Sequence, residues 1–165
     1  MSEPRISSFS PVCSPESRVL ILGTMASPAS LRAGFFYGHP QNAFWRILAE
    51  LTGDDPGPSP AEKRAFLLRR RIALWDTLES CAREGALDSA IRDEHPSDVT
   101  GLAARCPALR AVFLNGGAAL RFYKKYHAPR VALPYFGLPS TSPANARGGY
   151  AAKLSAWRAL LPYLG

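Results

Sequence analysis

Residues 37–45, YGHPQNAFW, hold the densest group of side chains in this chain that could carry chemistry on a planar ligand. Aromatic rings such as that of Tyr37 can stack on a nucleobase, and stacking contributes about 1 to 3 kcal/mol per base. The carboxamide of Asn42 can hold a water molecule by hydrogen bonds, but it cannot take a proton as a carboxylate can. If Asn42 is catalytic, the bond to the leaving group must therefore break before water attacks. In the alternative reading, Asn42 only caps a helix that begins at Ala43, and Tyr37 only packs.

Two later segments offer further polar groups. Asn115 ends the apolar run at residues 108–115, and its amide can accept from a ring N–H and donate to the adjacent carbonyl, an edge that uracil and hypoxanthine share. Asn115 could instead form a turn before two glycines. The loop PSTSPAN, residues 139–145, offers hydroxyl groups and backbone donors for phosphates, or serves only as a proline-rich connection to the last helix.

The elements that must position these groups follow an alternating order. Short apolar runs at 18–23, 72–76, 108–115 and 130–133 indicate strands that are covered on both faces. Helical patterns lie between and after them, at 43–51, 60–71, 98–105, 118–126 and 150–161. Ser59 and Glu62 have the spacing of a capping box at the start of the second of these helices. The order predicts an α/β fold, a doubly wound three-layer α/β/α sandwich with a central four-stranded parallel sheet. Because ligands bind at the carboxyl ends of such strands, the loops after Gly23, Asn115 and Pro139 should line one cleft.

Two stretches carry no clear period. Residues 1–17 are rich in serine and proline and are expected to form an irregular arm before the first strand. Residues 77–96 are expected to form a loop long enough to suspect a function. The 165 residues fit one domain spanning 1–165.

Charge and cysteine content narrow the function classes. Lys and Arg number 20 against 13 Asp and Glu, a formal net charge of +7, which favours a polyanionic partner or simply keeps the protein in solution. Cys13, Cys81 and Cys106 are far apart and show no paired spacing, so we expect reduced thiols in a cytoplasmic protein, with no metal and no cofactor. No signal-peptide core and no run of 18 apolar residues occur, so neither secretion nor a membrane is expected.

GTMAS at 23–27, YGHPQNAFW and PSTSPAN, in this order, resemble the motifs of the uracil-DNA glycosylase superfamily. The similarity is closest to the hypoxanthine-DNA glycosylase branch, the DNA-deoxyinosine glycosylases, with the mismatch-specific uracil glycosylases next. It extends over WDTLESCAREGALDSAI at 75–91 and VFLNGG at 112–117. The resemblance implies a monomer whose partner is DNA containing deaminated bases.

The resemblance also implies roles for residues. It makes Asn42 the catalytic amide and Tyr37 the ring that stacks on the extruded base. Met25 stands where the mismatch-specific relatives have a catalytic asparagine, and Ala26-Ser27 stands where the branch has Pro-Gly. The base-binding set that we expect is Tyr37, Met25, Gly23, Asn115 and His39, with a flanking phosphate as the alternative partner of His39.

The late loop should contact the DNA backbone. Pro143 and Ala144 form a compact wedge for the space that a flipped nucleotide leaves. The remaining candidate DNA contacts are Ser140, Ser142, Asn145 and Arg147, with Lys124 and Lys125 as further basic residues.

Asp76 and Asp88 are the acidic residues nearest the expected cleft. Either would be an aspartate base if it pointed inward, or both would brace the loop at 77–96 through hydrogen bonds.

These observations predict a monofunctional DNA glycosylase of base excision repair. It would hydrolyse the N-glycosidic bond of a flipped deaminated base, hypoxanthine first and uracil second. No lysine stands among the motif residues as an amine nucleophile, so no lyase activity is expected. The alternatives are a mismatch-specific uracil-DNA glycosylase, a non-catalytic module that binds damaged or abasic DNA, which Met25 keeps open, and a hydrolase of free nucleotides.

Overall fold

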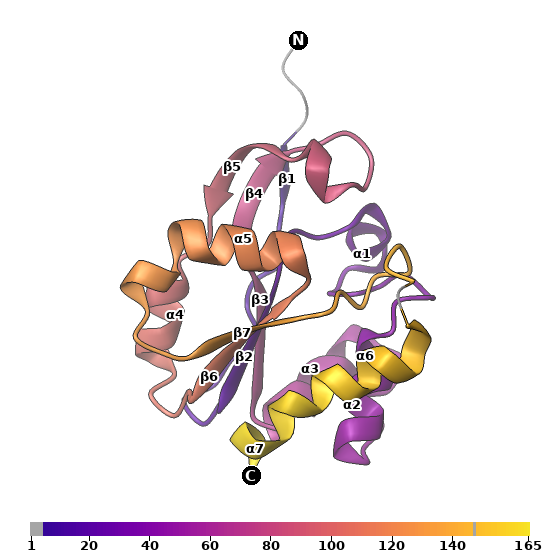
Figure 1. The fold of residues 1–165 in the computed structure, drawn as a ribbon, viewed down its shortest axis with the longest axis vertical. Coiled ribbons are helices and arrows are strands. Elements are labelled where there is room, and N and C mark those ends of the chain that lie inside the picture. Colours follow the sequence, from indigo (N-terminus) through magenta and orange to yellow (C-terminus); the bar gives the residue numbers. More distant parts are fainter. Residues whose placement is uncertain (1–4, 147) are drawn as a thin grey trace.

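The computed structural model describes residues 5–146 and 148–165, and its centre is a four-stranded parallel sheet (Figure 1). The strands are β2 (Val19–Gly23), β3 (Ile72–Asp76), β6 (Ala111–Asn115) and β7 (Tyr135–Leu138), in the order β3-β2-β6-β7. Every residue of β2, β3 and β6 is buried, as continuous apolar runs predict for strands covered on both faces. The α/β sandwich and its four-stranded parallel sheet are confirmed.

Helices cover both faces of this sheet (Figure 1). One layer contains α2 (Phe44–Thr52), α3 (Pro60–Arg69), α6 (Gly149–Trp157) and α7 (Leu161–Leu164), and the other contains α4 (Val99–Arg105) and α5 (Gly117–Tyr126). The Ser59 hydroxyl accepts from the Glu62 N–H at the start of α3, which confirms the cap read from the sequence. Short pieces complete the chain: α1 (Pro28–Ala33), η1 (Asp88–Ala90), η2 (Ala128–Arg130) and η3 (Arg158–Leu160).

The prediction of a fourth strand at 130–133 was wrong. The strand is β7, which begins two residues after that run, and it pairs with β6 from Val112↔Tyr135 to Asn115↔Leu138. Pro134 has no N–H, but its carbonyl accepts from the Val112 N–H at 2.9 Å, so a proline can begin the ladder. The earlier apolar run instead packs into the core through the buried Val131.

A second sheet stands where irregular structure was expected, above the parallel sheet in Figure 1. Its three antiparallel strands are β1 (Arg5–Ser7), β4 (Leu78–Ala82) and β5 (Arg92–Pro96), in the order β1-β4-β5. The expectation of a structureless 77–96 loop was therefore wrong. Within the arm expected at 1–17, Arg5–Ser7 forms β1, residues 8–17 are irregular apart from a single bridge at Val12, and the first four residues lie outside the described residues. The strands are short and partly exposed, and the β4 and β5 register is irregular, so no two-residue period marks them.

In the described part of the chain, no helix has the length and apolar character needed to cross a membrane.

Candidate active site

A cavity of about 420 Å³ opens at the carboxyl ends of β2, β3 and β6. This size lies within the range of roughly 300 to 1,000 Å³ that is typical of small-molecule sites. The cavity is lined by residues 23–27, 30, 36, 37, 42, 76, 83, 86–88, 115, 140–142, 144 and 145. The three loops that the topology predicted to converge therefore do meet here, joined by the connection between β4 and β5.

Tyr37 forms an aromatic wall of the cavity. Its ring stacks on Phe44 of α2, with 4.1 Å between the ring centroids and 27° between the planes. Tyr37 has φ +54°, a left-handed conformation that a bulky residue rarely adopts and that costs on the order of 1 to 3 kcal/mol. The Trp45 indole N–H donates to the Phe36 carbonyl at 3.1 Å and holds the turn in place. The fold thus maintains a strained backbone that directs this ring into the cavity.

The Tyr37 hydroxyl is buried and has no hydrogen-bond partner among the described residues. Burial raises the pKa of this hydroxyl well above its usual value, the charge of Asp76 raises it further, and the Asn115 amide lowers it. A Cβ atom placed on Gly23 would lie 2.7 Å from the Tyr37 hydroxyl oxygen and 2.7 Å from Asp76 Oδ1. Glycine at position 23 therefore allows these two polar groups to approach the floor of the cavity.

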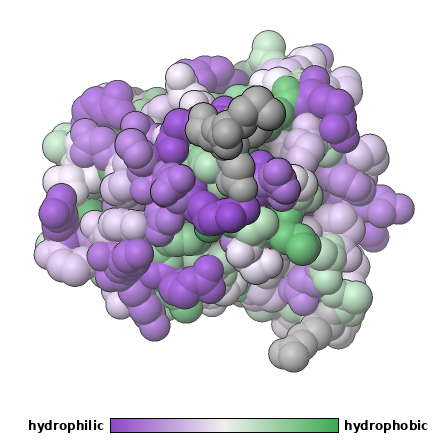
Figure 2. Space-filling model, turned by 90° about the horizontal axis from the view of Figure 1, so that it is seen from above, coloured by the Kyte–Doolittle hydropathy of each residue, from purple (hydrophilic) through white to green (hydrophobic). Residues whose placement is uncertain are grey.

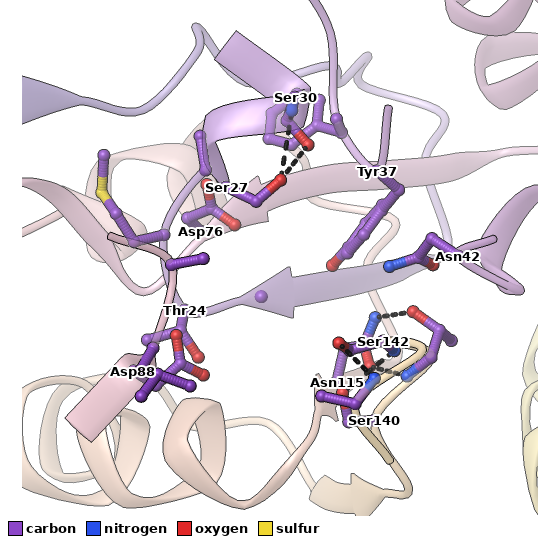
Figure 3. A pocket seen from close by; sticks show the side chains of 18 of the residues that line it. Thr24, Ser27, Ser30, Tyr37, Asn42, Asp76, Asp88, Asn115, Ser140 and Ser142 are labelled. Atoms are coloured by element: carbon purple, nitrogen blue, oxygen red, sulfur yellow. Dashed lines mark hydrogen bonds between the residues drawn. The ribbon is translucent and has the colours of Figure 1, made fainter. Parts of the chain in front are cut away.

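Asn42 lies just before α2, whose N-cap is Ala43, and it contacts both the helix and the cavity. Its Oδ1 accepts from the Phe44 N–H at 3.0 Å, which satisfies a donor of the first turn of α2. Its amide also lines the cavity, where Figure 3 shows it beside Tyr37. A carbonyl oxygen has two lone pairs, so Oδ1 can accept from the helix and still accept from a water molecule. The bond to the Phe44 N–H therefore restricts the orientation of the amide at the cavity wall.

Asn115 is tied to the loop after β7. Its amide nitrogen donates to Thr141 Oγ1 and its Oδ1 accepts from the Thr141 N–H, each at 3.0 Å (Figure 3). Both ends of the amide thus hold the buried Thr141, a role that sequence reasoning missed because nothing local links these positions. Asn115 also lines the cavity, and each end of its amide keeps one hydrogen-bonding position that Thr141 does not use.

The loop at 139–145 is held at several points. The Trp157 indole donates to the Pro139 carbonyl at 2.9 Å, and the Lys153 ammonium donates to the Ser142 carbonyl at 3.1 Å. The Ala43 N–H donates to the Thr141 carbonyl at 3.0 Å, which joins this loop to the Asn42 segment. The loop is therefore positioned before any ligand arrives.

Three residues of that loop line the cavity and also form hydrogen bonds within the loop: Ser140, Ser142 and Asn145. Ser140 Oγ accepts from the Ser142 N–H, and the Asn145 amide donates to the Ser140 carbonyl, each at 3.1 Å. Pro143 and Ala144 are exposed, and Ala144 lies at the cavity edge.

Three other predicted site residues have different surroundings. Met25 lines the cavity and packs in an apolar cluster with Ala26, Leu78, Cys81 and Phe122, so it is a wall without hydrogen-bonding capacity. His39 does not line the cavity, and its Nδ1 accepts from the Gln41 N–H at 3.1 Å, which leaves the phosphate contact as its candidate role. Arg147 lies outside the described residues.

Asp76 and Asp88 form an acidic wall of the cavity. Asp76 is 3% exposed, lines the cavity and accepts from the Ser8 hydroxyl at 2.7 Å. Burial raises the pKa of Asp76 to about 7, the charge of Asp88 raises it too, and Ser8 and Arg83 lower it. Asp88 lies on the same side, next to Thr24 (Figure 3), and burial also raises the pKa of its carboxyl. The usable signal was the position of Asp76 at the end of an apolar strand, opposite Gly23.

Comparison with known proteins decides the family. Residues 10–161 match the family model described as the uracil DNA glycosylase superfamily. The chain belongs to this superfamily, and it is a DNA glycosylase. A curated protein of Methanosarcina acetivorans, named hypoxanthine DNA glycosylase, is 35% identical over 140 residues, which cover 84% of this chain and 87% of that protein. A protein of the same name from Methanosarcina barkeri is 37% identical over 109 residues, 66% of this chain and 69% of that protein.

Comparison with solved structures indicates the same superfamily. A solution NMR structure of a Methanosarcina acetivorans protein, described as a candidate uracil DNA glycosylase, superposes with a TM-score of 0.84. The two sequences are 32% identical, and the match covers 98% of this chain and 99% of that one. The prediction of the superfamily and of an enzyme acting on DNA is confirmed.

The glycosylase carries the surface that a polyanion requires. Its formal net charge is +7, and the face at the β1, β4 and β5 end is mostly hydrophilic, with apolar side chains scattered among polar ones (Figure 2). Leu87, at the cavity rim, is 67% exposed. The net positive charge of the whole chain is the property that favours contact with DNA phosphates.

Proposed function

We propose that this DNA glycosylase removes hypoxanthine, the product of adenine deamination, from DNA and leaves an abasic site. The observation that carries the proposal is the shared cavity, in which the Tyr37 ring faces the Asn42 amide. A planar base can stack on the ring while the amide holds water near the sugar. The names of the two Methanosarcina relatives support hypoxanthine as the base.

The reaction breaks the bond between C1′ of the deoxyribose and the base nitrogen, and the electron pair leaves with the base. Water oxygen then bonds to C1′ and releases one proton, while the base takes up one proton. An amide is a very weak base, so Asn42 orients the water and stabilises the cationic sugar instead of taking a proton from the water. Charge therefore develops on the departing base before attack, and donors in the pocket must stabilise it.

Access requires that the nucleotide leave the base stack, because the cavity cannot reach an atom inside a duplex. Two apolar groups at the cavity edge fit the vacated space: Pro143 with Ala144, as the sequence predicted, and the exposed Leu87 on the opposite loop. The serine hydroxyls of the 139–145 loop act as acceptors within the loop, so their own protons can be donated to phosphate oxygens. Uracil is the second candidate base, because it shares the N–H and carbonyl edge of hypoxanthine.

The test is base release from labelled duplexes that carry one hypoxanthine, uracil or xanthine opposite each normal base, followed by alkaline strand cleavage. Asn42→Ser is the informative variant, since serine also caps helices while removing the amide. Asn42→Ser should keep the thermal stability and the DNA affinity of the wild type, whereas its single-turnover rate of base release should fall at least a hundredfold. Asn42→Ala is the less specific companion, because it also removes the cap, a loss of about 0.5 to 2 kcal/mol of stability.

Cleavage of hypoxanthine duplexes by the wild type and not by Asn42→Ser would establish the activity and its central residue. Tight binding without release of any base would contradict the proposal and favour a damage-binding role. Among the described residues, no lysine lines the cavity, so borohydride should trap no protein–DNA adduct. A trapped adduct would show that the enzyme is not monofunctional.

A further inference from the structure

The carboxyl group of Asp76 lies on the cavity floor and remains unused by the proposed reaction. Its Oδ1 and the Tyr37 hydroxyl both lie 2.7 Å from the position where a Gly23 Cβ would stand, so both reach the same point above the end of β2. The Tyr37 hydroxyl has no partner there among the described residues. Both polar atoms thus border the same point of the cavity floor, where the edge of a stacked base could reach them, and the Asn115 amide uses one bonding position at each end for Thr141.

Ser8 distinguishes the two oxygens of this carboxyl group. Its hydroxyl donates to Oδ2 at 2.7 Å, so in the neutral acid Oδ2 is the carbonyl oxygen and the proton lies on Oδ1. A donor on Oδ1 suits a base that presents a carbonyl oxygen, as hypoxanthine, uracil and xanthine do. Adenine presents an amino group at that position, and two donors cannot pair.

The charge on the departing base determines which protonation state of Asp76 can assist the reaction. Negative charge grows on the base as the glycosidic bond breaks, and an ionised carboxylate beside it would oppose that charge. A neutral acid donates to it instead. Resting on the proposed function, we propose that Asp76, as the neutral acid, donates a hydrogen bond from Oδ1 to the carbonyl of the departing base and thereby favours hypoxanthine over adenine.

The surroundings of Asp76 favour the neutral form near neutrality. Burial is the main cause of its raised pKa, and the carboxylate of Asp88 adds to it, while Arg83 and the Ser8 hydroxyl act in the opposite direction. Two more titratable groups are near. They are the Tyr37 hydroxyl, whose pKa burial raises, and His127, which follows α5 and binds the carbonyl of Thr77, the residue after Asp76, at 2.8 Å. Burial lowers the pKa of His127, so its charge is lost at a lower pH than usual.

The experiment measures single-turnover release of hypoxanthine from a duplex between pH 5.5 and 9 for the wild type, Asp76→Asn, Asp76→Ala and Ser8→Ala. The wild-type rate should fall tenfold per pH unit above about neutral pH. Asp76→Asn supplies an N–H donor that does not titrate, so it should keep at least a tenth of the wild-type rate at pH 6 and lose the alkaline fall. Ser8→Ala removes a bond that lowers the pKa of Asp76, so its alkaline fall should begin at a higher pH.

Three results would overturn the inference while leaving the glycosylase activity in place. The alkaline fall could persist in Asp76→Asn, which would assign it to another group such as His127. Asp76→Asn could lose all activity at every pH despite retained folding and DNA binding, which would make Asp76 a carboxylate base. Asp76→Ala could match the wild type. Failure of the proposed function is distinct, because the wild type itself would then release no hypoxanthine at any pH.

Discussion

Replacing Tyr37 with phenylalanine should make the protein more stable and the enzyme slower. The substitution removes one oxygen atom that is buried, without a hydrogen-bond partner among the described residues, and directed into the cavity. A buried polar group without a partner costs about 1 to 3 kcal/mol, and this cost disappears in the variant. For a chain of 165 residues, each kcal/mol raises Tm by roughly 2 to 4 °C.

The loss of activity follows from the same atom. The ring and its stacking on Phe44 remain, so DNA binding should change little. A hydrogen bond to a charged group contributes about 1.5 to 3 kcal/mol, and the departing base carries charge only in the transition state. The single-turnover rate should therefore fall by about tenfold to a hundredfold, at 1.4 kcal/mol per factor of ten.

Tyr123→Phe is the matched control. Its hydroxyl on α5 is also buried without a partner among the described residues, and Tyr123 does not line the cavity. It should gain stability in the same range with unchanged kinetics, as measured by thermal unfolding and single-turnover assays in parallel. A Tyr37→Phe variant that is as fast as the wild type, or that loses stability while Tyr123→Phe gains it, would refute the reasoning.

Two further predictions concern the cavity floor. Gly23→Ala should lower the free energy of unfolding by about 1 to 3 kcal/mol and the rate of base release at least tenfold, because the added Cβ would displace Tyr37 and Asp76. In Gly117→Ala the added Cβ meets no neighbour, so this control should change neither quantity in urea unfolding and base-release assays. Asp76 binds a proton in the folded state up to a pKa of about 7 but only to about 3.9 when unfolded, so wild-type stability should fall by about 1.4 kcal/mol per pH unit between these values. Asp76→Asn should lack that slope in urea unfolding at pH 5 to 7, and parallel slopes would show that Asp76 is ionised in the folded protein.

Local patterns in the sequence predicted much of the framework. The strands β2, β3 and β6 are continuous apolar runs, and the cap at Ser59 is read from residues within one turn of each other. Such features depend on residues that are close together in the sequence, so they can be predicted without the tertiary structure. The convergence of three loops on one cavity followed from the parallel order alone, since parallel strands end at the same edge of the sheet.

The strands that the sequence did not predict depend on distant partners. β1 is a strand because it pairs with β4, more than seventy positions away along the chain, and three residues form no sheet alone. β7 contains a glycine and follows a proline, so its pattern indicated a loop until β6 supplied the ladder. Pairing energy between segments far apart in sequence decides such elements, and no local period carries it.

The sequence by itself determined the family, the parallel sheet and the Asn42 and Tyr37 segment, since these rest on consecutive residues. Only the tertiary structure decided how each polar group in the cavity is used. It places Thr141 on both ends of the Asn115 amide, leaves the Tyr37 hydroxyl without a partner among the described residues, and buries Asp76 beside Ser8. Protonation and hydrogen-bonding capacity depend on burial and on neighbours distant in the chain, and both exist only once the chain has folded.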